Sequence, residues 1–274
     1  MAKEKQEKAF DGFEIDAEFL AQLEKNEALD AQDGKDGLNV SFISLAKEKT
    51  KALDEDNKEL YIEGLKLKDL FIQKTKRVLG KSIKVVPLAF FNLFAQYSDT
   101  SKNAKYLSTW TFEEGDKFPL VSGSYYDRLL PNGKGILKPI TWVVVYLPDF
   151  PDIDKPVITF KSTGNKVAAN WLKSIRNEHK LTTQCLFEVK AGKQTNADGD
   201  SWFEFEPKLI GLTFDKVADK VQANVPYVKE LIELSNEYRS MYSQGTLIPS
   251  RINSVLSSDG NALSIEDQTD DVVF

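Results

Sequence analysis

The chain has 274 residues, of which 41% are hydrophobic and 28% charged, and its formal net charge is −6. This composition predicts one domain of ordinary size with appendages, or two small domains, around a real core. No apolar run approaches about 18 residues and the N-terminus lacks the apolar region of a secretory signal, so we expect no membrane span and a cytoplasmic protein. With one cysteine, Cys185, and one histidine, His179, an internal disulfide and a His-rich metal site are excluded, and Cys/His or Ser/His catalysis is disfavoured.

Basic residues are concentrated in the middle of the chain. From Gly64 to Lys190 there are 20 Lys and Arg against 11 Asp and Glu, whereas residues 1–63 and 191–274 have net charges of −8 and −7. The stretch from Gly64 to Gly211 also holds 20 of the 30 aromatic residues, including all four tryptophans. Rings that stack unpaired bases and cations that contact phosphates are what a single-strand binding surface requires. The alternative is a β-rich core whose outside is coated with lysines.

The segments before the basic region are acidic and less regular. Residues 1–12 are predicted to be disordered, and a helix with Asp16 as its N-cap is predicted from Phe13. Residues 38–43 alternate like a strand, and residues 46–59 are polar, as in a helix or a linker.

The central segments have the patterns of β-strands. The alternation of Leu and Lys over residues 65–68 predicts a half-buried strand with a basic outer face within residues 61–72. The long apolar run of residues 83–97 contains Pro87, which requires a sheet edge or a bulge. Further strands are predicted at residues 106–112, 140–146, 157–160, 186–190 and 202–205. The last two would form a hairpin around the turn signal Asp198-Gly199-Asp200.

One helix, from Asn165 to Asn177, is predicted among the strands, and another from Pro226 to Gly245 after them. This inventory predicts a mainly β (α+β) protein: a partly open, antiparallel barrel like the oligonucleotide-binding (OB) fold, with helical N- and C-terminal flanks. The predicted organisation is an acidic N-terminal extension (1–60), the OB-like core (61–212), a C-terminal helix (213–245) and a flexible acidic tail (246–274).

The end of the chain, Asp270-Asp271-Val272-Val273-Phe274, is acidic and finishes in phenylalanine. Such an end is similar to the tail of single-stranded DNA-binding proteins from bacteria and their tailed phages. The segments 64–94, 156–174 and 198–205 also resemble the core of diverged phage versions. The chain departs from the bacterial form in its two helical flanks and in having no Gly/Gln/Pro-rich linker.

The resemblance implies an OB-fold core that binds single-stranded DNA without sequence preference in replication, recombination or repair, with no cofactor, no metal and no enzymatic step. It also implies that Asp270, Asp271 and Phe274 recruit replication and recombination proteins. An acidic tail with a terminal ring can in addition occupy the protein's own basic groove and compete with DNA. The oligomeric state stays open.

The predicted DNA-binding residues fall into two groups. The predicted stacking residues are Trp110, Phe112, Tyr125, Tyr126, Trp202 and Phe203. The predicted phosphate contacts are Lys74, Lys76, Arg77, Lys105, Arg128, Lys161 and Lys166. Among the tryptophans, Trp110 and Trp202 are predicted to be exposed on alternating strands, and Trp142 and Trp171 to be packed.

Two other classes of function remain as alternatives. Glu188 and Lys190, with Asp149 or Asp152 upstream, resemble the metal-binding core of PD-(D/E)xK nucleases, in which carboxylates and a lysine hold Mg²⁺ and a water. A protein-interaction module would instead use the aromatic surface to bind proteins and its acidic ends to mimic the charge of DNA.

Overall fold

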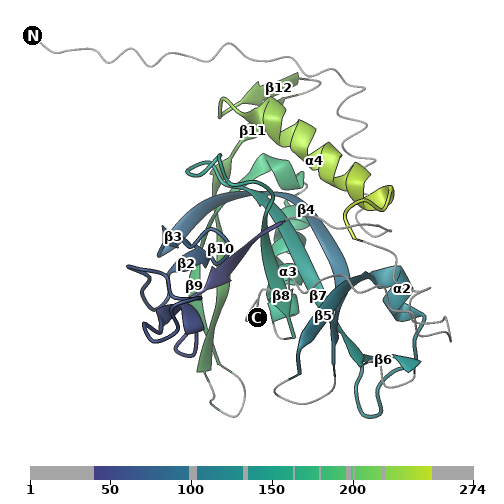
Figure 1. Cartoon of the computed structure of the whole chain (residues 1–274). Coiled ribbons are helices and arrows are strands. Elements are labelled where there is room, and N and C mark those ends of the chain that lie inside the picture. Colours follow the sequence, from purple (N-terminus) through teal and green to yellow (C-terminus); the bar gives the residue numbers. More distant parts are fainter. Residues whose placement is uncertain are drawn as a thin grey trace, which may run out of the picture.

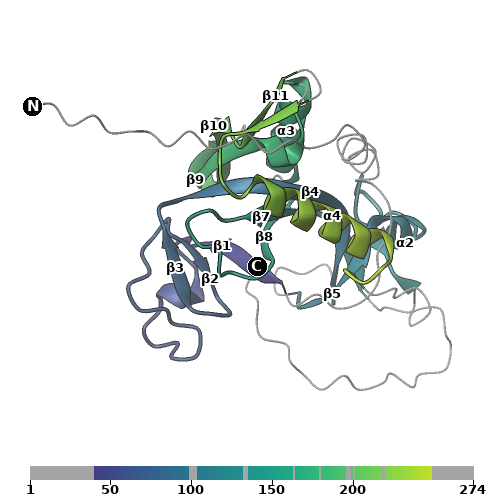
Figure 2. The same cartoon turned by 90° about the horizontal axis from the view of Figure 1, so that it is seen from above.

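A computed structural model describes residues 40–98, 104–131, 135–162, 164–178, 180–195, 199, 201–217 and 220–248 (Figure 1). The protein is mainly β, with a curled sheet of half-barrel shape and few helices (Figures 1 and 2). The predictions for residues 1–39, which include the N-terminal helix, and for the tail from residue 249 lie outside the described residues.

The sheet is built around the long strand β4 (Ser82–Tyr97). Four strands extend it on both sides in the order β10-β9-β4-β7-β8, and every neighbouring pair is antiparallel. Their bounds are β7 Ile136–Tyr146, β8 Pro156–Lys161, β9 Cys185–Thr195 and β10 Ser201–Leu212. Within it, β9-β4-β7-β8 has the spatial order 4-1-2-3 of a Greek key, and α3 (Gly164–Asn177) lies in the long connection from β8 to β9. The predicted internal helix and the predicted hairpin are confirmed.

Pro87 lies at a bulge, as predicted. The register of β4 against β7 shifts between Pro87 and Ala89, and β4 pairs with β9 only up to Val85. At the register shift the carbonyl of Leu88 accepts hydrogen bonds from the hydroxyls of Ser235 (2.8 Å) and Thr182 (3.4 Å). A proline that cannot donate to the ladder is therefore accommodated where β4 changes partners.

Three strands from the N-terminal part extend the sheet beyond β8: β1 (Ser41–Leu45), β2 (Leu70–Ile72) and β3 (Arg77–Gly80). Because β1 runs parallel to β8, the sheet is mixed, and this pair departs from the predicted antiparallel arrangement.

The predicted strand over residues 65–68 is also wrong. These residues form a turn in which the N–H of Asp69 donates to the carbonyl of Lys66 (3.0 Å), while the Asp69 carboxylate accepts from the N–H of Lys66 (2.8 Å). A φ of +70° at Lys68 is incompatible with an extended strand. Local turn chemistry overrides the Leu/Lys alternation.

An insertion between β4 and β7 adds β5 (Tyr106–Thr111), the short helix α2 (Phe112–Asp116) and β6 (Arg128–Leu129). The predicted strand ends at Thr111, whose hydroxyl accepts a hydrogen bond from the N–H of Glu114 and caps α2. The remaining elements are η1 Lys51–Leu53, η3 Thr182–Gln184, β11 Phe214–Val217, β12 Lys220–Ala223 and α4 Val228–Ser243. The helix predicted from Pro226 is α4.

The core lies on both faces of the sheet. On the inner face, α3 packs Trp171 against Phe90, Phe160 and Phe187. On the outer face, α4 packs against β4, where Tyr242 stacks on Phe91 with ring centroids 4.4 Å apart. The predictions that Trp142 and Trp171 are packed are confirmed, and Cys185 is buried as well. Among the described residues, no helix is long and apolar enough to cross a membrane.

Candidate nucleic-acid interface

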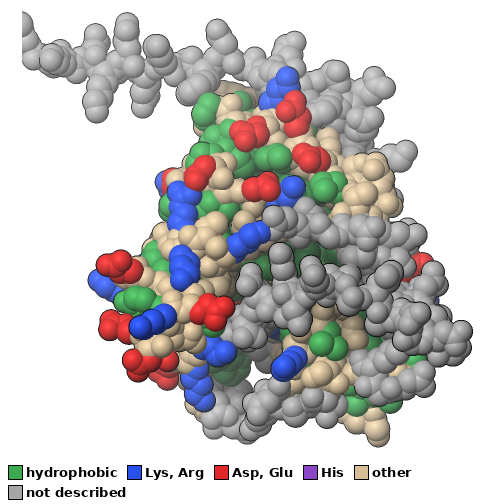
Figure 3. Space-filling model, viewed as in Figure 1, with side chains coloured by type: hydrophobic (Ala, Val, Ile, Leu, Met, Phe, Trp, Pro, Cys, Tyr) green, Lys and Arg blue, Asp and Glu red, His purple; other side chains and the backbone are tan. Residues whose placement is uncertain are grey.

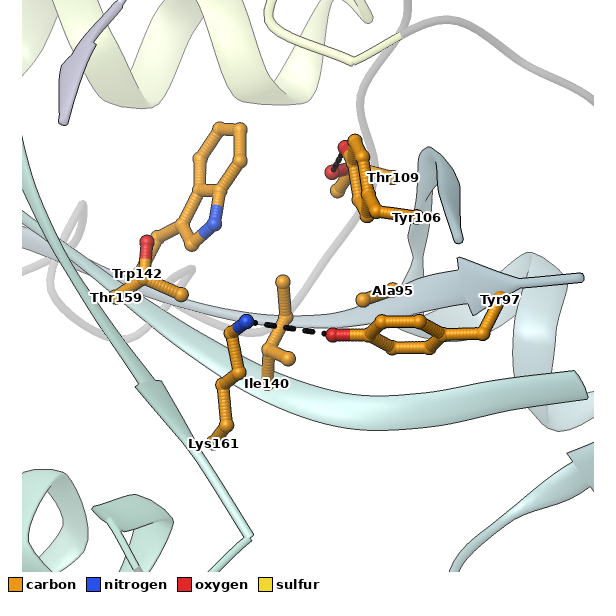
Figure 4. Close-up of a pocket in the computed structure, with 8 residues that line it drawn as sticks. All are labelled: Ala95, Tyr97, Tyr106, Thr109, Ile140, Trp142, Thr159 and Lys161. Carbon is orange, nitrogen blue, oxygen red and sulfur yellow. Dashed lines mark hydrogen bonds between the residues drawn. The ribbon is translucent and has the colours of Figure 1, made fainter. Parts of the chain in front are cut away.

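The outer face of the sheet carries a pocket with aromatic walls and a lysine (Figure 4). Alternate residues of neighbouring strands point to one side of a sheet, and paired residues therefore share a face. Lys161 on β8 pairs with Ile140 on β7, and Thr159 pairs with Trp142. The full lining is Ala95, Tyr97, Tyr106, Thr109, Ile140, Trp142, Thr159 and Lys161, from β4, β5, β7 and β8.

The lysine of this pocket is joined to its aromatic wall. The Lys161 ammonium donates a hydrogen bond to the Tyr97 hydroxyl at 3.3 Å, as Figure 4 shows. The pKa of Lys161 is lowered to about 7, mostly by burial and also by the positive charges of Lys47 and Lys138, while the Glu204 carboxylate opposes them. Burial also raises the pKa of the Tyr97 hydroxyl, so the tyrosine stays neutral. The environment of Lys161 therefore disfavours its charged form, and an anion bound next to the ammonium would stabilise that form.

The rings and lysines of this face form what we call the aromatic strip. It consists of the pocket residues Tyr97, Tyr106, Trp142 and Lys161, together with Lys138 and Phe42. The Lys138 ammonium lies 5.5 Å from the centroid of the Tyr97 ring, within cation–π range. Tyr106 meets Tyr97 edge to face at 6.2 Å, and Phe42 on β1 meets Trp142 edge to face at 5.4 Å. Trp142 is only 6% exposed, whereas Tyr97 and Tyr106 are half-buried and retain accessible surface. The strip thus offers rings for stacking and ammonium groups for phosphates.

Gly135 fixes the end of β4 that carries Tyr97. Its φ is +105°, and a Cβ built there would lie 1.9 Å from the Tyr97 carbonyl oxygen. Only glycine combines this backbone conformation with such a close approach. Glycine at position 135 is therefore a packing requirement beside Tyr97, which lines the pocket.

The predicted stacking residues have different surroundings. Trp110 is fully buried, and its indole N–H donates to Gln96 Oε1 (3.0 Å) and Ser108 Oγ (3.1 Å). The prediction that Trp110 is exposed is wrong, because the β5 face that carries it packs against Phe94 and Phe118.

The other five predicted stacking residues retain exposed surface but lie in separate places. Phe112 starts α2 and stacks on Phe94, and Tyr125 and Tyr126, 86% and 69% exposed, lie in the loop before β6. Trp202 and Phe203, both half-buried, lie on β10. None of the five lines the pocket.

Of the predicted phosphate contacts, Lys161 alone lines the pocket. Lys105 precedes β5 and is exposed, close in sequence to Tyr106. Arg77 and Arg128 form ion pairs with Asp152 and Asp116, so part of their charge is already neutralised. The remaining exposed lysines lie on other elements: Lys74 and Lys76 between β2 and β3, and Lys166 on α3.

Sequence analysis missed Tyr97, Tyr106, Lys138, Phe42 and Lys47 as site residues. Tyr97 and Tyr106 belong to segments that were predicted as strands, but no pattern within either segment shows that β4 and β5 pair. Cross-strand pairing, with Tyr97 opposite Tyr106, is what assembles the strip.

The carboxylates of the nuclease alternative lie next to basic residues, and Asp152 forms its ion pair with Arg77. Glu188 lies opposite Lys84 on β4 and Lys208 on β10, and Asp149 is 3.4 Å from the Lys84 ammonium. Within the part of the chain that the structure describes, no three His, Cys, Asp or Glu side chains form a group that could hold a metal ion. The tail residues Asp270, Asp271 and Phe274 lie outside the described residues.

Comparisons with protein-family models, with curated proteins and with solved structures found no match.

Proposed function

We propose that the protein binds single-stranded DNA without sequence preference, through the outer face of β4, β5, β7 and β8, in replication, recombination or repair. The observation that supports this most is the gathering of Tyr97 and Tyr106 with Lys138 and Lys161 on one sheet face. The rings supply stacking platforms that accept any base, and the ammonium groups supply phosphate contacts. Binding of this kind needs no cofactor and no chemical step.

The position of the strip within the fold supports the same proposal. We infer that β4, β7, β8, β9 and β10 are strands one to five of a partly open OB barrel, with α3 between the third and fourth. In OB folds nucleic acid lies on strands two and three, between the loop joining strands one and two and the loop joining strands four and five. Part of the strip, with Lys138, Trp142 and Lys161, lies on β7 and β8, which correspond to strands two and three. The insertion of β5, α2 and β6 corresponds to the loop between strands one and two.

The charge distribution favours a local rather than a global attraction to DNA. The whole chain carries −6, while the segment that forms the strip belongs to the basic middle of the sequence. Long-range attraction is therefore weak, and affinity depends on close contacts that salt screens.

The test is fluorescence anisotropy of a labelled oligo-dT with the full-length protein at several salt concentrations, in parallel with a duplex of equal length. We expect tight, salt-sensitive binding of the single strand and weaker binding of the duplex. Tyr106→Ala should weaken single-strand binding by about 1–3 kcal/mol, the contribution of one stacked base. Tyr61→Ala, which removes a half-buried tyrosine that does not line the pocket, is the control. Absence of oligonucleotide binding by the folded protein would refute the proposal.

We also propose that the C-terminal tail, with Asp270, Asp271 and Phe274, recruits partner proteins and competes with DNA for the basic surface. The support is the acidic, Phe-terminated sequence and its resemblance to the tails of single-strand binding proteins. A protein ending at Ser258 should bind oligo-dT more tightly than the full chain at low salt. Equal affinities of the two would contradict the competition.

A further inference from the structure

A lysine and a phenylalanine meet across the opening of the curled sheet. The Lys68 ammonium lies 4.3 Å from the centroid of the Phe203 ring, within cation–π range. Lys68 belongs to the turn before β2, near one end of the strand order, and Phe203 lies on β10 at the other end. The contact therefore spans the side on which the half-barrel is open. Figure 3 shows Lys and Arg side chains, interspersed with Asp and Glu, on the side of the molecule where Figure 1 places β3, β9 and β10.

Lys68 occupies a backbone conformation that favours glycine. It is the third residue of the turn closed by the hydrogen bond from the Asp69 N–H to the Lys66 carbonyl, and its φ is +70°. Turns with a positive φ at this position normally have glycine or asparagine there. A lysine is strained in this conformation, and such strain is typical of residues kept for function.

Lys47 connects this turn to the aromatic strip. Ala46 donates its N–H to the carbonyl of Asp69 (2.9 Å) and accepts at its own carbonyl from the N–H of Lys68 (2.8 Å), which places the adjoining Lys47 beside the turn. On the other side, Lys47 acts electrostatically on Lys161. Lys161, Lys47 and Lys68 thus follow one another from the pocket, past the end of β8, to the opening of the sheet.

We propose that a bound nucleic-acid strand leaves the aromatic strip over the end of β8 and follows Lys47 to Lys68, whose ammonium contacts a backbone phosphate while Phe203 holds it in place. This inference rests on the proposed function and adds a direction and a second anchor to the site. Because Lys68 already covers the Phe203 ring, Phe203 positions the cation in this arrangement rather than stacking a base.

Glu204 is a carboxylate that acts on this path. It follows Phe203 on β10, and its Oε2 lies 3.1 Å from the point where a Cβ on Gly164 would stand. Its negative charge raises the pKa of Lys161. A phosphate passing between Lys161 and Lys47 would meet its negative charge. Glu204→Gln should therefore tighten binding of long oligomers, in contrast to the lysine substitutions.

The test is Lys68→Gly, which removes the cation and relieves the backbone strain at once. The matched control is Lys155→Gly: Lys155 also has a positive φ (+46°), but it precedes β8 at the end opposite Lys161. Anisotropy titrations use oligo-dT of about 6 and about 20 nucleotides, spanning the range of OB site sizes. For the long oligomer, Lys68→Gly should lower the salt slope by about 0.7, the value of one phosphate contact on a single strand. The short oligomer should bind both variants like the wild type.

The melting temperature separates a binding role from a structural one. Lys68→Gly should melt at or above the wild-type temperature while it binds the long oligomer several-fold more weakly. Phe203→Leu, which keeps an apolar side chain against the core but removes the ring, should give a smaller loss. An unchanged salt slope in Lys68→Gly, or an equal loss of affinity in Lys155→Gly, would overturn this inference. The proposed function would still stand in that case, provided that the wild type binds the oligomers. Absence of wild-type binding to either oligomer would instead overturn both.

Discussion

Lys161 should make single-strand binding depend on pH. In the folded protein burial lowers its pKa to about 7, so the side chain is about half protonated at pH 7 and about one tenth protonated at pH 8. A phosphate next to the ammonium favours the charged form and raises the pKa again. Binding above pH 7 therefore includes the uptake of a proton.

The size of the effect follows from linkage. Each pH unit above about 7 should weaken the Lys161 contact by up to about tenfold, or 1.36 kcal/mol, until the pKa of the bound state is reached. Affinity is highest below pH 7 and falls as the pH rises. The groups that act on Lys161 include Tyr97, Lys47, Lys138 and Glu204, and burial keeps Tyr97 neutral over this range.

Protein stability should change in the opposite direction. The unfolded lysine keeps its proton to about pH 10.4, whereas the folded one loses it near 7, so the unfolded state binds more protons between these values. The Lys161 contribution to the free energy of unfolding therefore rises with pH across this window. Opposite signs for binding and stability distinguish this lysine from a group that merely stabilises the fold.

The assay is oligo-dT anisotropy from pH 6 to 8.5 at constant ionic strength, with wild type, Lys161→Arg and Lys161→Met. Arginine stays charged and should give a flat profile, whereas methionine should bind like deprotonated wild type at every pH. The single histidine, His179, is replaced by Gln in all three proteins, because an unperturbed imidazole changes its charge between pH 5 and 8. A wild-type profile that is flat, or that Lys161→Met reproduces, would refute the reasoning.

Two further predictions concern the scaffold of the site. Gly135→Ala should lower the free energy of unfolding, measured by chemical denaturation, by about 2 kcal/mol or more. The left-handed conformation costs about 1–2 kcal/mol, and the new Cβ also meets the Tyr97 carbonyl. Gly123 has a φ of +79° but open space around it, so Gly123→Ala should lose only the conformational part. Trp110→Phe should lower stability by about 1–3 kcal/mol through a cavity and a lost N–H donor, with oligo-dT affinity unchanged. A loss of affinity comparable to that of Tyr106→Ala would place Trp110 at the interface after all.

Much of the secondary structure follows from local sequence patterns. The apolar run of residues 83–97 predicts β4, Pro87 predicts its bulge, and helical spacing predicts α3 and α4. These features depend on neighbours within a few residues, so a single sequence contains the information. The turn at residues 65–68 misleads the same reasoning because a strained Lys68 lacks the glycine signal that marks such turns.

The candidate site depended on the tertiary structure. Charge and aromatic content placed a binding surface somewhere within the basic middle of the chain, and Lys161 was the one predicted contact that reached the pocket. Which ring of an alternating strand faces the core is decided by its partner strand: β5 turns Trp110 inward against Phe94 and sets Tyr106 opposite Tyr97. The sequence by itself determined which residue types were available for stacking and for phosphate contacts. Strand pairing and register, which join residues far apart in the chain, decided which of them share a face.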